Sequence, residues 1–382
     1  MMVVEMMRPI PTLWIVLAAS VFAQPRDAGL ETALRAHQAG QWETAAEGYR
    51  AFLKKNPSAF EIRSNLGAVL VKLGLYEDAI VEYRAALAKA PANPGIGFNL
   101  GLAYYKAGAI PDAAREFSTV RLIAPNNAQL NLILADCWLQ MGDNAKVVAL
   151  LDPTYEAQPG ERSVAYVLGT ALLRSGQVER GQKVLNAIFA EGDSAEARLL
   201  IGTSKLNSAD VPGAMAELSK AVELNPALPS VHSYHGLALL MSGDVAQAAE
   251  AFQRELANNP NDFTANLNLA ALLKQDQEYG KARVHLDRAL RVRPGDTGVR
   301  YQLATIALAE GEVEKARTAL ESVIAEAPEF VEAHVSLATV YYRQKRKADG
   351  DRERALVEKL NAEIQARQPK GEPIAPKAVA QP

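Results

Sequence analysis

Several residue classes are scarce in this chain of 382 residues, and each scarcity excludes something. There is one cysteine, Cys137, so no disulfide can form within the chain. It lies in a helical apolar pattern without a nearby base, which indicates a small buried thiol rather than a reactive one. Aromatic residues make up only 6%, and 41 basic residues nearly balance 44 acidic ones. The net charge of −3 gives no overall bias towards nucleic acid.

Sequence motifs of catalysis are also missing. No H-E-x-x-H, G-x-S-x-G, Walker-type loop or G-x-G-x-x-G occurs in a fitting context. His232 and His235 are three residues apart and could share one helix face, but a closed zinc site needs four ligands. We therefore predict that the chain is not an enzyme and has no cofactor and no metal site.

What the sequence does contain is a helix hairpin that recurs. In residues 65–91, apolar residues follow a helical spacing on both sides of Gly74, which permits the positive φ of a tight turn. Pro91 then ends the second helix. A hairpin of this size leaves one apolar face open, so it needs a neighbour to cover it.

Prolines show that such neighbours exist. The prolines form two series, and in both series neighbouring prolines are separated by the same number of residues. The gap between the last proline of the first series and the first proline of the second equals two such intervals minus one residue. The first series is Pro57, Pro91, Pro125 and Pro159, and the second is Pro226, Pro260, Pro294 and Pro328. The chain is therefore predicted to be a tandem array of helix hairpins, with no strand-like alternation anywhere.

One unit carries a family pattern in the order Gly67, Gly74, Tyr76, Ala79, Tyr83, Ala86 and Pro91. This pattern resembles the tetratricopeptide repeat, a helix–turn–helix unit of about 34 residues, which is also the proline interval. The resemblance implies an all-α fold: a right-handed superhelical solenoid of stacked hairpins, with a C-terminal capping helix. It also implies a concave groove that is lined by the first helices and binds protein segments.

The register divides the chain into four parts. Residues 1–23 are a predicted signal peptide, and residues 24–347 hold about nine regular units plus one irregular unit. Residues 348–368 form the capping helix, with Leu356, Leu360 and Ile364 as its apolar edge. Residues 369–382 are proline-rich, lack aromatic residues and are predicted to be disordered.

The first 23 residues have the three-part plan of a secretory signal peptide. Arg8 precedes the apolar run Leu13–Ala19, and cleavage after Ala23 would leave Gln24 as the N-terminus. The run is shorter than the roughly 20 residues of a comfortable membrane span. We expect an exported protein of a bacterial periplasm or one secreted beyond it, with an uncleaved membrane anchor as the alternative.

The stretch 147–195 departs from the pattern. Val147 and Gly181 stand where alanine is usual, and Pro153 falls inside a second helix, where proline costs about 3 kcal/mol or more. We expect this helix to be shortened or kinked. Two interpretations remain open: a bend that divides the array into two arms, or drift in a repeat that its neighbours hold in place.

The resemblance also places candidate binding residues on the groove side of the first helices. Aromatic and basic side chains would contact a ligand segment, and the amides would contact its backbone. The candidates are Asn65, Lys72, Phe98, Asn99, Tyr105, Lys106, Tyr166, Arg174, Asn268, Tyr301, Gln302 and Tyr342. The family's clamp for a terminal carboxylate is not met, because Ser64 and Phe98 stand where lysine would be wanted.

These features favour an exported, non-enzymatic scaffold that binds a protein or peptide partner, with no nucleic acid and no membrane contact beyond the signal segment. Two alternatives remain. One is an accessory protein of envelope polysaccharide or peptidoglycan assembly or secretion, whose aromatic groove residues could stack on sugars. The other is a chain that presents substrate to a separate enzyme.

Overall fold

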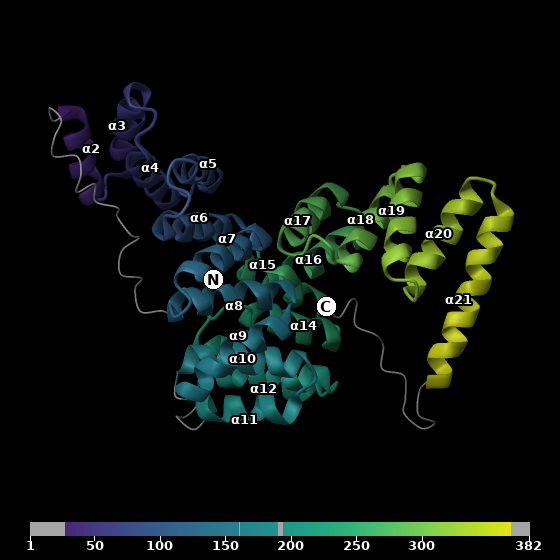
Figure 1. Ribbon diagram of the computed structural model, residues 1–382. Helices are drawn as coiled ribbons and strands as arrows, with labels where there is room; N and C mark the ends of the chain where they lie inside the picture. Colours follow the sequence, from purple (N-terminus) through teal and green to yellow (C-terminus); the bar gives the residue numbers. More distant parts are fainter. Residues whose placement is uncertain (1–26, 160, 190–193, 368–382) are drawn as a thin grey trace. The chain divides into compact units, whose positions relative to one another are not determined.

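The computed structural model describes residues 27–159, 161–189 and 194–367 (Figure 1). In these ranges the regular secondary structure is α-helical, and no strand occurs. None of the helices in the described part combines the length and the apolar character that a membrane crossing needs. The predicted signal peptide, residues 1–23, and the predicted disordered tail, residues 369–382, lie outside the described ranges, so both stay predictions.

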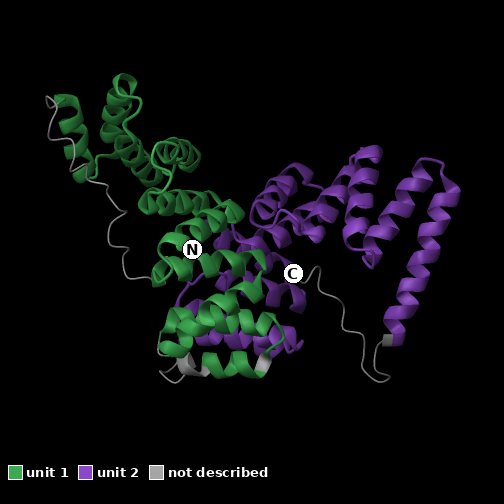
Figure 2. Ribbon diagram, in the orientation of Figure 1, with its two compact units in different colours: residues 1–193 green, residues 194–382 purple. Residues whose placement is uncertain are grey.

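The chain divides into two compact units, residues 1–193 and 194–382 (Figure 2). The division falls within the irregular stretch 147–195, and the bend predicted there stays a prediction. The helices of the first unit are α2 (Ala28–Gln38), α3 (Trp42–Lys55), α4 (Phe60–Lys72), α5 (Tyr76–Leu87), α6 (Pro94–Ala107), α7 (Ile110–Ile123), α8 (Ala128–Met141), α9 (Asn144–Ala157), α10 (Arg162–Arg174) and α11 (Val178–Phe189). Those of the second are α12 (Ala195–Asn207), α13 (Val211–Leu224), α14 (Val231–Ser242), α15 (Val245–Asn258), α16 (Phe263–Gln275), α17 (Tyr279–Val292), α18 (Thr297–Ala309), α19 (Val313–Glu326), α20 (Val331–Arg343) and α21 (Lys347–Arg367).

Within each unit, consecutive helices pack in pairs, and each pair packs against the next. The pairs begin with α2 and α3 in the first unit and with α12 and α13 in the second. Each pair is one hairpin of the register that the prolines set. The predicted all-α fold of stacked helix hairpins is therefore confirmed.

The turn inside each hairpin needs one residue with positive φ. Glycine fills this position in seven hairpins, at Gly40, Gly74, Gly108, Gly142, Gly176, Gly243 and Gly311. Ala209, Gln277 and Lys345 take the same position with φ near 60°. The predicted role of Gly74 is thus confirmed, and the last hairpin forms the same turn with a lysine. A side chain with a Cβ is strained at such an angle.

Glycines on the first helices let large side chains of the second helices approach the backbone. A Cβ on Gly67 would stand 2.9 Å from the Tyr83 ring, and one on Gly236 would stand 2.7 Å from the Phe252 ring. Both rings are fully buried. This close approach shows why these positions favour small residues.

Polar side chains fix where first helices begin. Asn93 accepts backbone hydrogen bonds from Gly95 and Ile96, and Asp262 accepts one from Ala265, so both residues cap their helices. A second kind of hydrogen bond is formed six residues after three of the inter-hairpin prolines: Arg63, Asn131 and Asn266 donate to the carbonyl oxygens of Pro57, Pro125 and Pro260. Both kinds of hydrogen bond satisfy backbone N–H or C=O groups that have no partner at the end of a helix.

Some residues near the start of first helices also contact a residue 19 positions later, on the second helix of the same hairpin. Arg63 Nη1 lies 2.8 Å from Glu82 Oε2, and Arg198 Nη1 lies 2.6 Å from Glu217 Oε2. His334 Nδ1 lies 2.6 Å from Glu353 Oε2 in the last hairpin. These polar pairs tie the two helices of a hairpin together outside the apolar contact.

We expected Pro153 to shorten or kink its helix; the shortening is wrong, and the kink stays a prediction. Helix α9 runs from Asn144 to Ala157, which is 14 residues, as long as α7. Its apolar side chains Val147, Leu150 and Leu151 are buried. Burial of this face stabilises the helical backbone through the proline, because packing outweighs local propensity.

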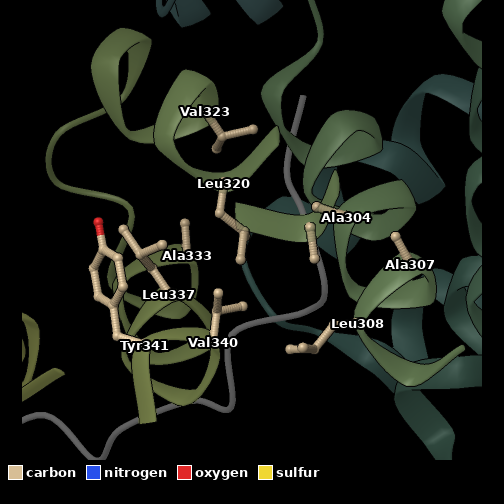
Figure 3. Close-up of a cluster of buried hydrophobic side chains, with 10 residues drawn as sticks. Ala304, Ala307, Leu308, Leu320, Val323, Ala333, Leu337, Val340 and Tyr341 are labelled. Atoms are coloured by element: carbon tan, nitrogen blue, oxygen red, sulfur yellow. The ribbon is translucent and has the colours of Figure 1, made fainter. Parts of the chain in front are cut away.

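Helix α21 packs against α20 at the C-terminal end of the described chain (Figure 1). Leu360 is buried, and Leu356 and Ile364 are half-buried, which matches the apolar edge expected of a cap. In the core between α18, α19 and α20, the side chains of Leu320, Leu337 and Val340 converge on Ala304 and Leu308 (Figure 3).

Candidate functional site

The candidate site is the exposed surface of the first helices, here called the first-helix face of each unit. In the second unit it is formed by α12, α14, α16, α18 and α20, and each of the last four contacts the one before it. In the first unit α4 contacts α6, and α8 contacts α10. Consecutive first helices therefore lie side by side, so side chains from different hairpins can meet on this face.

In the first unit, a buried polar cluster joins α6 to α8. The hydroxyl of Tyr105 donates to Asp136 Oδ2 at 2.5 Å, and Gln140 Nε2 donates to the same carboxylate at 2.7 Å. Gln140 also donates to the Tyr105 hydroxyl oxygen at 3.1 Å. Tyr105 and Asp136 are buried, so the cluster stabilises the face from within.

The predicted binding residues fall into two groups by exposure. Lys72, Arg174 and Tyr342 are exposed, and Phe98, Lys106 and Tyr301 are half-buried. The other six are buried: Asn65, Asn99, Tyr105, Tyr166, Asn268 and Gln302. Exposed and half-buried members can contact a ligand in this conformation. The binding role of every member stays a prediction.

The amide side chains that were predicted to contact the backbone of a bound segment have different surroundings. Asn268 Nδ2 donates to the carbonyl oxygen of Thr264, one turn earlier in its own helix, at 2.8 Å. Gln302 accepts a hydrogen bond from Lys274. Asn99 is buried, and neither of its side-chain amide atoms has a hydrogen-bond partner within the described residues. A buried amide in this state destabilises the fold, because it has lost water and gained nothing in return.

At the end of the second unit, Tyr342 and Arg343 present side chains from α20. The Tyr342 hydroxyl donates to Asp351 Oδ1 at 2.8 Å, and the Arg343 guanidinium donates to the Leu308 carbonyl oxygen at 2.8 Å. Tyr342 keeps 36% of its surface exposed despite its bond to α21. Val335, on the same helix, is 49% exposed. An exposed ring and an exposed aliphatic side chain give this helix an apolar surface for binding.

Lys274 on α16 is a residue of this face that the sequence analysis missed. Its ammonium donates to Gln302 Oε1 and, at 3.2 Å, to Thr305 Oγ1, both on α18. Burial lowers the pKa of this ammonium. The signal that could have identified it is its register position, where Leu240 stands one repeat earlier and Leu308 one repeat later.

A second missed feature is a buried acid pair at the start of α14. Glu255 accepts backbone hydrogen bonds from Ser230 at 2.9 Å and His232 at 3.2 Å. Asp262 accepts from the hydroxyl of Ser230 at 3.0 Å and from that of Ser233 at 2.7 Å. Burial, and then the Asp262 carboxylate, raise the pKa of Glu255 to about 8. Other hairpins have apolar residues at the position equivalent to Glu255, namely Ala221, Ala289 and Val323. The Glu255 carboxyl group therefore lies where these hairpins place a core residue.

His232 and His235 on α14 and Cys137 on α8 are all buried or half-buried. His232 is buried, and His235 lies 3.3 Å from the Ser219 hydroxyl. Across residues 27–159, 161–189 and 194–367, no group of three or more His, Cys, Asp or Glu residues is placed to hold a metal ion. Cys137 is buried, and this burial raises the pKa of its thiol, as expected of an inert cysteine.

Three of the similarities to known proteins illustrate what this chain resembles. Residues matching "BBSome complex member bbs-4" of Caenorhabditis elegans are 25% identical over 134 residues, which is 35% of this chain and 29% of that protein. The structure "MamA 41-end from Desulfovibrio magneticus RS-1" is 23% identical, with a TM-score of 0.40, over 45% of this chain and 97% of that one. A monomeric mutant of IFIT1 with Gppp-AAAA is 14% identical, with a TM-score of 0.47, over 87% of this chain and 90% of that one. The chain thus spans under a third of the curated relative's length.

Sequence profiles of one family match most of the hairpins. The profile described as "TPR repeat" matches residues 69–108, and one described as "Tetratricopeptide repeat" matches residues 273–329. A further "Tetratricopeptide repeat" profile matches residues 98–161, 166–229 and 235–297, together half of the chain. All of these matches fall within residues 69–329. The chain belongs to the tetratricopeptide repeat family.

Proposed function

We propose that the chain is an exported, non-enzymatic scaffold that holds a segment of a partner protein on its first-helix faces. The family supports a role in protein–protein interaction, because its stacked hairpins leave one row of helices open to other molecules. The observation that carries the proposal is the exposure of large apolar side chains on first helices of the second unit. Met241 on α14 is 38% exposed, and Val335 and Tyr342 on α20 are exposed to a similar degree.

The kind of partner follows from these side chains. Exposed apolar and aromatic groups on helices that lie side by side suit a segment that buries leucine or aromatic anchors. On the first-helix face of the first unit, the basic residues Lys72, Lys106 and Arg174 suit a segment with some acidic character. A protein segment therefore fits this face better than a nucleic acid or a glycan.

The experiment compares capture of partners by matched variants. The purified chain is used as bait in extract from its own host, beside a variant with Val335→Ser and Tyr342→Ser. Val284→Ser is the control, because Val284 is 50% exposed on the second helix α17. We expect the double variant to lose a partner that the control retains. Equal retention by both variants would overturn the assignment of the binding face.

Export is the second part of the proposal. It is supported by Arg8, the apolar run Leu13–Ala19 and Ala23 at the expected cleavage site. The test is N-terminal sequencing of the protein purified from the envelope fraction of its host. We expect Gln24 as the first residue. An intact N-terminus on protein from the cytosolic fraction would contradict export, and an intact N-terminus on membranes would favour the uncleaved anchor.

A further inference from the structure

Lys274 interrupts a row of apolar residues that share one register position on the first helices of the second unit. Leu240 on α14 stands one repeat before it, and Leu308 on α18 stands one repeat after it. Because the register places these residues at equivalent points of α14, α16 and α18, they follow one another across the contacting first helices. A charged group thus occupies a position that the neighbouring hairpins give to leucine.

The partners of Lys274 are both neutral. Its ammonium donates to Gln302 Oε1 and to Thr305 Oγ1. The hydroxyl proton of Thr305 is directed to the carbonyl oxygen of Gln302 at 2.8 Å, so the Thr305 oxygen acts as an acceptor for the lysine. An ammonium has three N–H donors, so one remains for another acceptor. No carboxylate of the described residues forms an ion pair with Lys274.

Several other cations of the second unit are supplied with a counter-charge by the chain itself. The ion pairs are Arg198 with Glu217, Arg283 with Glu310, Arg300 with Glu326, and Arg317 with Glu321. Lys274 is half-buried like several of these arginines, yet it has only amide and hydroxyl oxygens around it. Taking a charge out of water without a counter-charge destabilises the charged form. A carboxylate from outside the chain would restore the missing interaction.

Arg343 brings a second cation to the same helix. Its guanidinium donates to the carbonyl oxygen of Leu308, and Lys274 donates to the side chain of Thr305. Thr305 and Leu308 are three residues apart on α18, so both cations meet that helix within one turn. Arg343 is exposed and, like Lys274, has no ion pair with a described carboxylate. Two cationic side chains therefore contact the last turns of α18.

We propose that Lys274 is a carboxylate-binding point on this face, which takes an Asp or Glu side chain of a bound partner segment beside an apolar anchor. The anchor would contact Leu240 and Met241 of the preceding repeat, which are half-buried and exposed, respectively. This inference rests on the proposed function and adds to it the chemical class of one ligand group. Charge-assisted hydrogen bonds to a carboxylate are about twice as strong as the bonds between neutral groups.

The test uses the full chain and two dodecapeptides, acetylated and amidated so that neither has a terminal carboxylate. Both carry the same leucine and phenylalanine residues, and they differ only in glutamate or glutamine at three positions. Binding is followed by fluorescence anisotropy. We expect the glutamate peptide to bind about tenfold more tightly, by about 1.4 kcal/mol at this ratio. We expect added salt to reduce that preference.

Variants show whether the preference belongs to Lys274. Lys274→Met should abolish it, Lys274→Arg should keep most of it, and Lys281→Met on α17 should leave it unchanged. If Lys274→Met lowers the urea midpoint, Lys274→Gln takes its place, since it retains hydrogen bonding. A lysine that only bridges α16 and α18 would affect stability and leave peptide preference unchanged. Preference that survives in Lys274→Met, or no binding of the glutamate peptide to the parent chain, overturns the inference.

The same variants separate this inference from the function on which it rests. Suppose that a natural partner is lost with the Val335→Ser and Tyr342→Ser substitutions but binds Lys274→Met as well as the parent chain. This result would support the scaffold function and overturn the carboxylate-binding role of Lys274. A partner that is held equally by all of these variants removes the binding face itself.

Discussion

The ring of Phe117 on α7 packs so closely on Gly101 of α6 that a Cβ on the glycine would stand 2.5 Å from the ring carbon Cε1. Phe117 is fully buried. Gly67 and Tyr83 form the equivalent pair in the preceding hairpin. Two hairpins of the second unit place alanine and leucine in the same register, namely Ala270 with Leu286 and Ala304 with Leu320. A larger residue on one helix is thus matched by a smaller one on the other.

Gly101→Ala tests this match. We expect the added methyl group to cost about 1–3 kcal/mol, because Phe117 cannot move without disturbing a close-packed core. Phe117→Leu in the same chain should recover part of the loss, since it restores the alanine–leucine pairing of other hairpins. The measurement is the urea midpoint followed by circular dichroism.

Gly280→Ala on α17 serves as the control for Gly101→Ala. No atom lies within 4 Å of a Cβ built there, so the change adds helix propensity without a clash. It should leave the midpoint unchanged or raise it. Equal losses at Gly101 and Gly280 would show that the approach of the Phe117 ring is not what requires glycine.

Hairpin turns without glycine offer a gain in stability. Gln277 and Lys345 have φ of 61°, where a residue with a Cβ is destabilised by roughly 1–2 kcal/mol. Gln277→Gly should therefore stabilise the fold by up to about 1 kcal/mol after the greater freedom of the unfolded chain is counted. Gly311→Ala, at the same turn position one hairpin later, should destabilise it. A urea midpoint that falls with Gln277→Gly would contradict this account of the turn.

Much of the fold could be predicted because its main determinants are local. The prolines set the hairpin spacing, and Gly74 marks a turn whose geometry glycine alone takes without strain. The turn at Lys345 could not be read in this way, since neighbouring packing imposes the angle on a residue that does not favour it. For the same reason Pro153 misled the prediction, because burial of Leu150 and Leu151 holds α9 helical.

The pH dependence of the unfolding free energy should reveal the raised pKa of Glu255. Burial and the Asp262 carboxylate raise its pKa in the folded chain from 4.5 to about 8, so the folded state holds a proton that the unfolded state has released. This contribution to stability is present below about pH 4.5 and is lost as the pH rises to about 8. Glu255→Gln cannot titrate, so the difference in unfolding free energy between parent and variant should change across this window.

The comparison between parent and variant is needed because buried histidines act in the opposite direction. Burial lowers the pKa of His232 and His285, so their contribution to stability is lost as the pH falls below their ordinary value. Those histidines are present in both chains and cancel in the difference. A difference that stays constant from pH 4 to pH 9 would exclude a perturbed Glu255.

The tie between α20 and α21 gives a further prediction. His334 is buried and lies between Glu353 Oε2 at 2.6 Å and the Pro328 carbonyl oxygen at 2.9 Å. Glu353→Ala should cost about 1–3 kcal/mol, because it leaves one buried ring nitrogen without a partner. Hydrogen exchange in α21 should rise most. Glu358→Ala, at an exposed position of the same helix, should leave exchange unchanged, and equal effects would contradict the role of Glu353.

The candidate site was harder to predict than the fold. Tyr105 was expected in the groove from its register, but its hydroxyl bonds to Asp136, which belongs to the next hairpin. Whether a first-helix residue faces outwards or packs on its neighbour depends on such contacts between hairpins, which single repeats do not encode. Lys274 shows the converse: its departure from leucine is visible in the register, but its neutral surroundings are not.

The most direct test of the binding face is site-specific photo-crosslinking in the native host. A benzophenone amino acid is placed at Tyr342 on the first helix α20 and, separately, at Val284 on the second helix α17, both of which are exposed. The account predicts that a partner protein crosslinks from position 342 and not from position 284. A partner that crosslinks from 284 and is absent from 342 would contradict it.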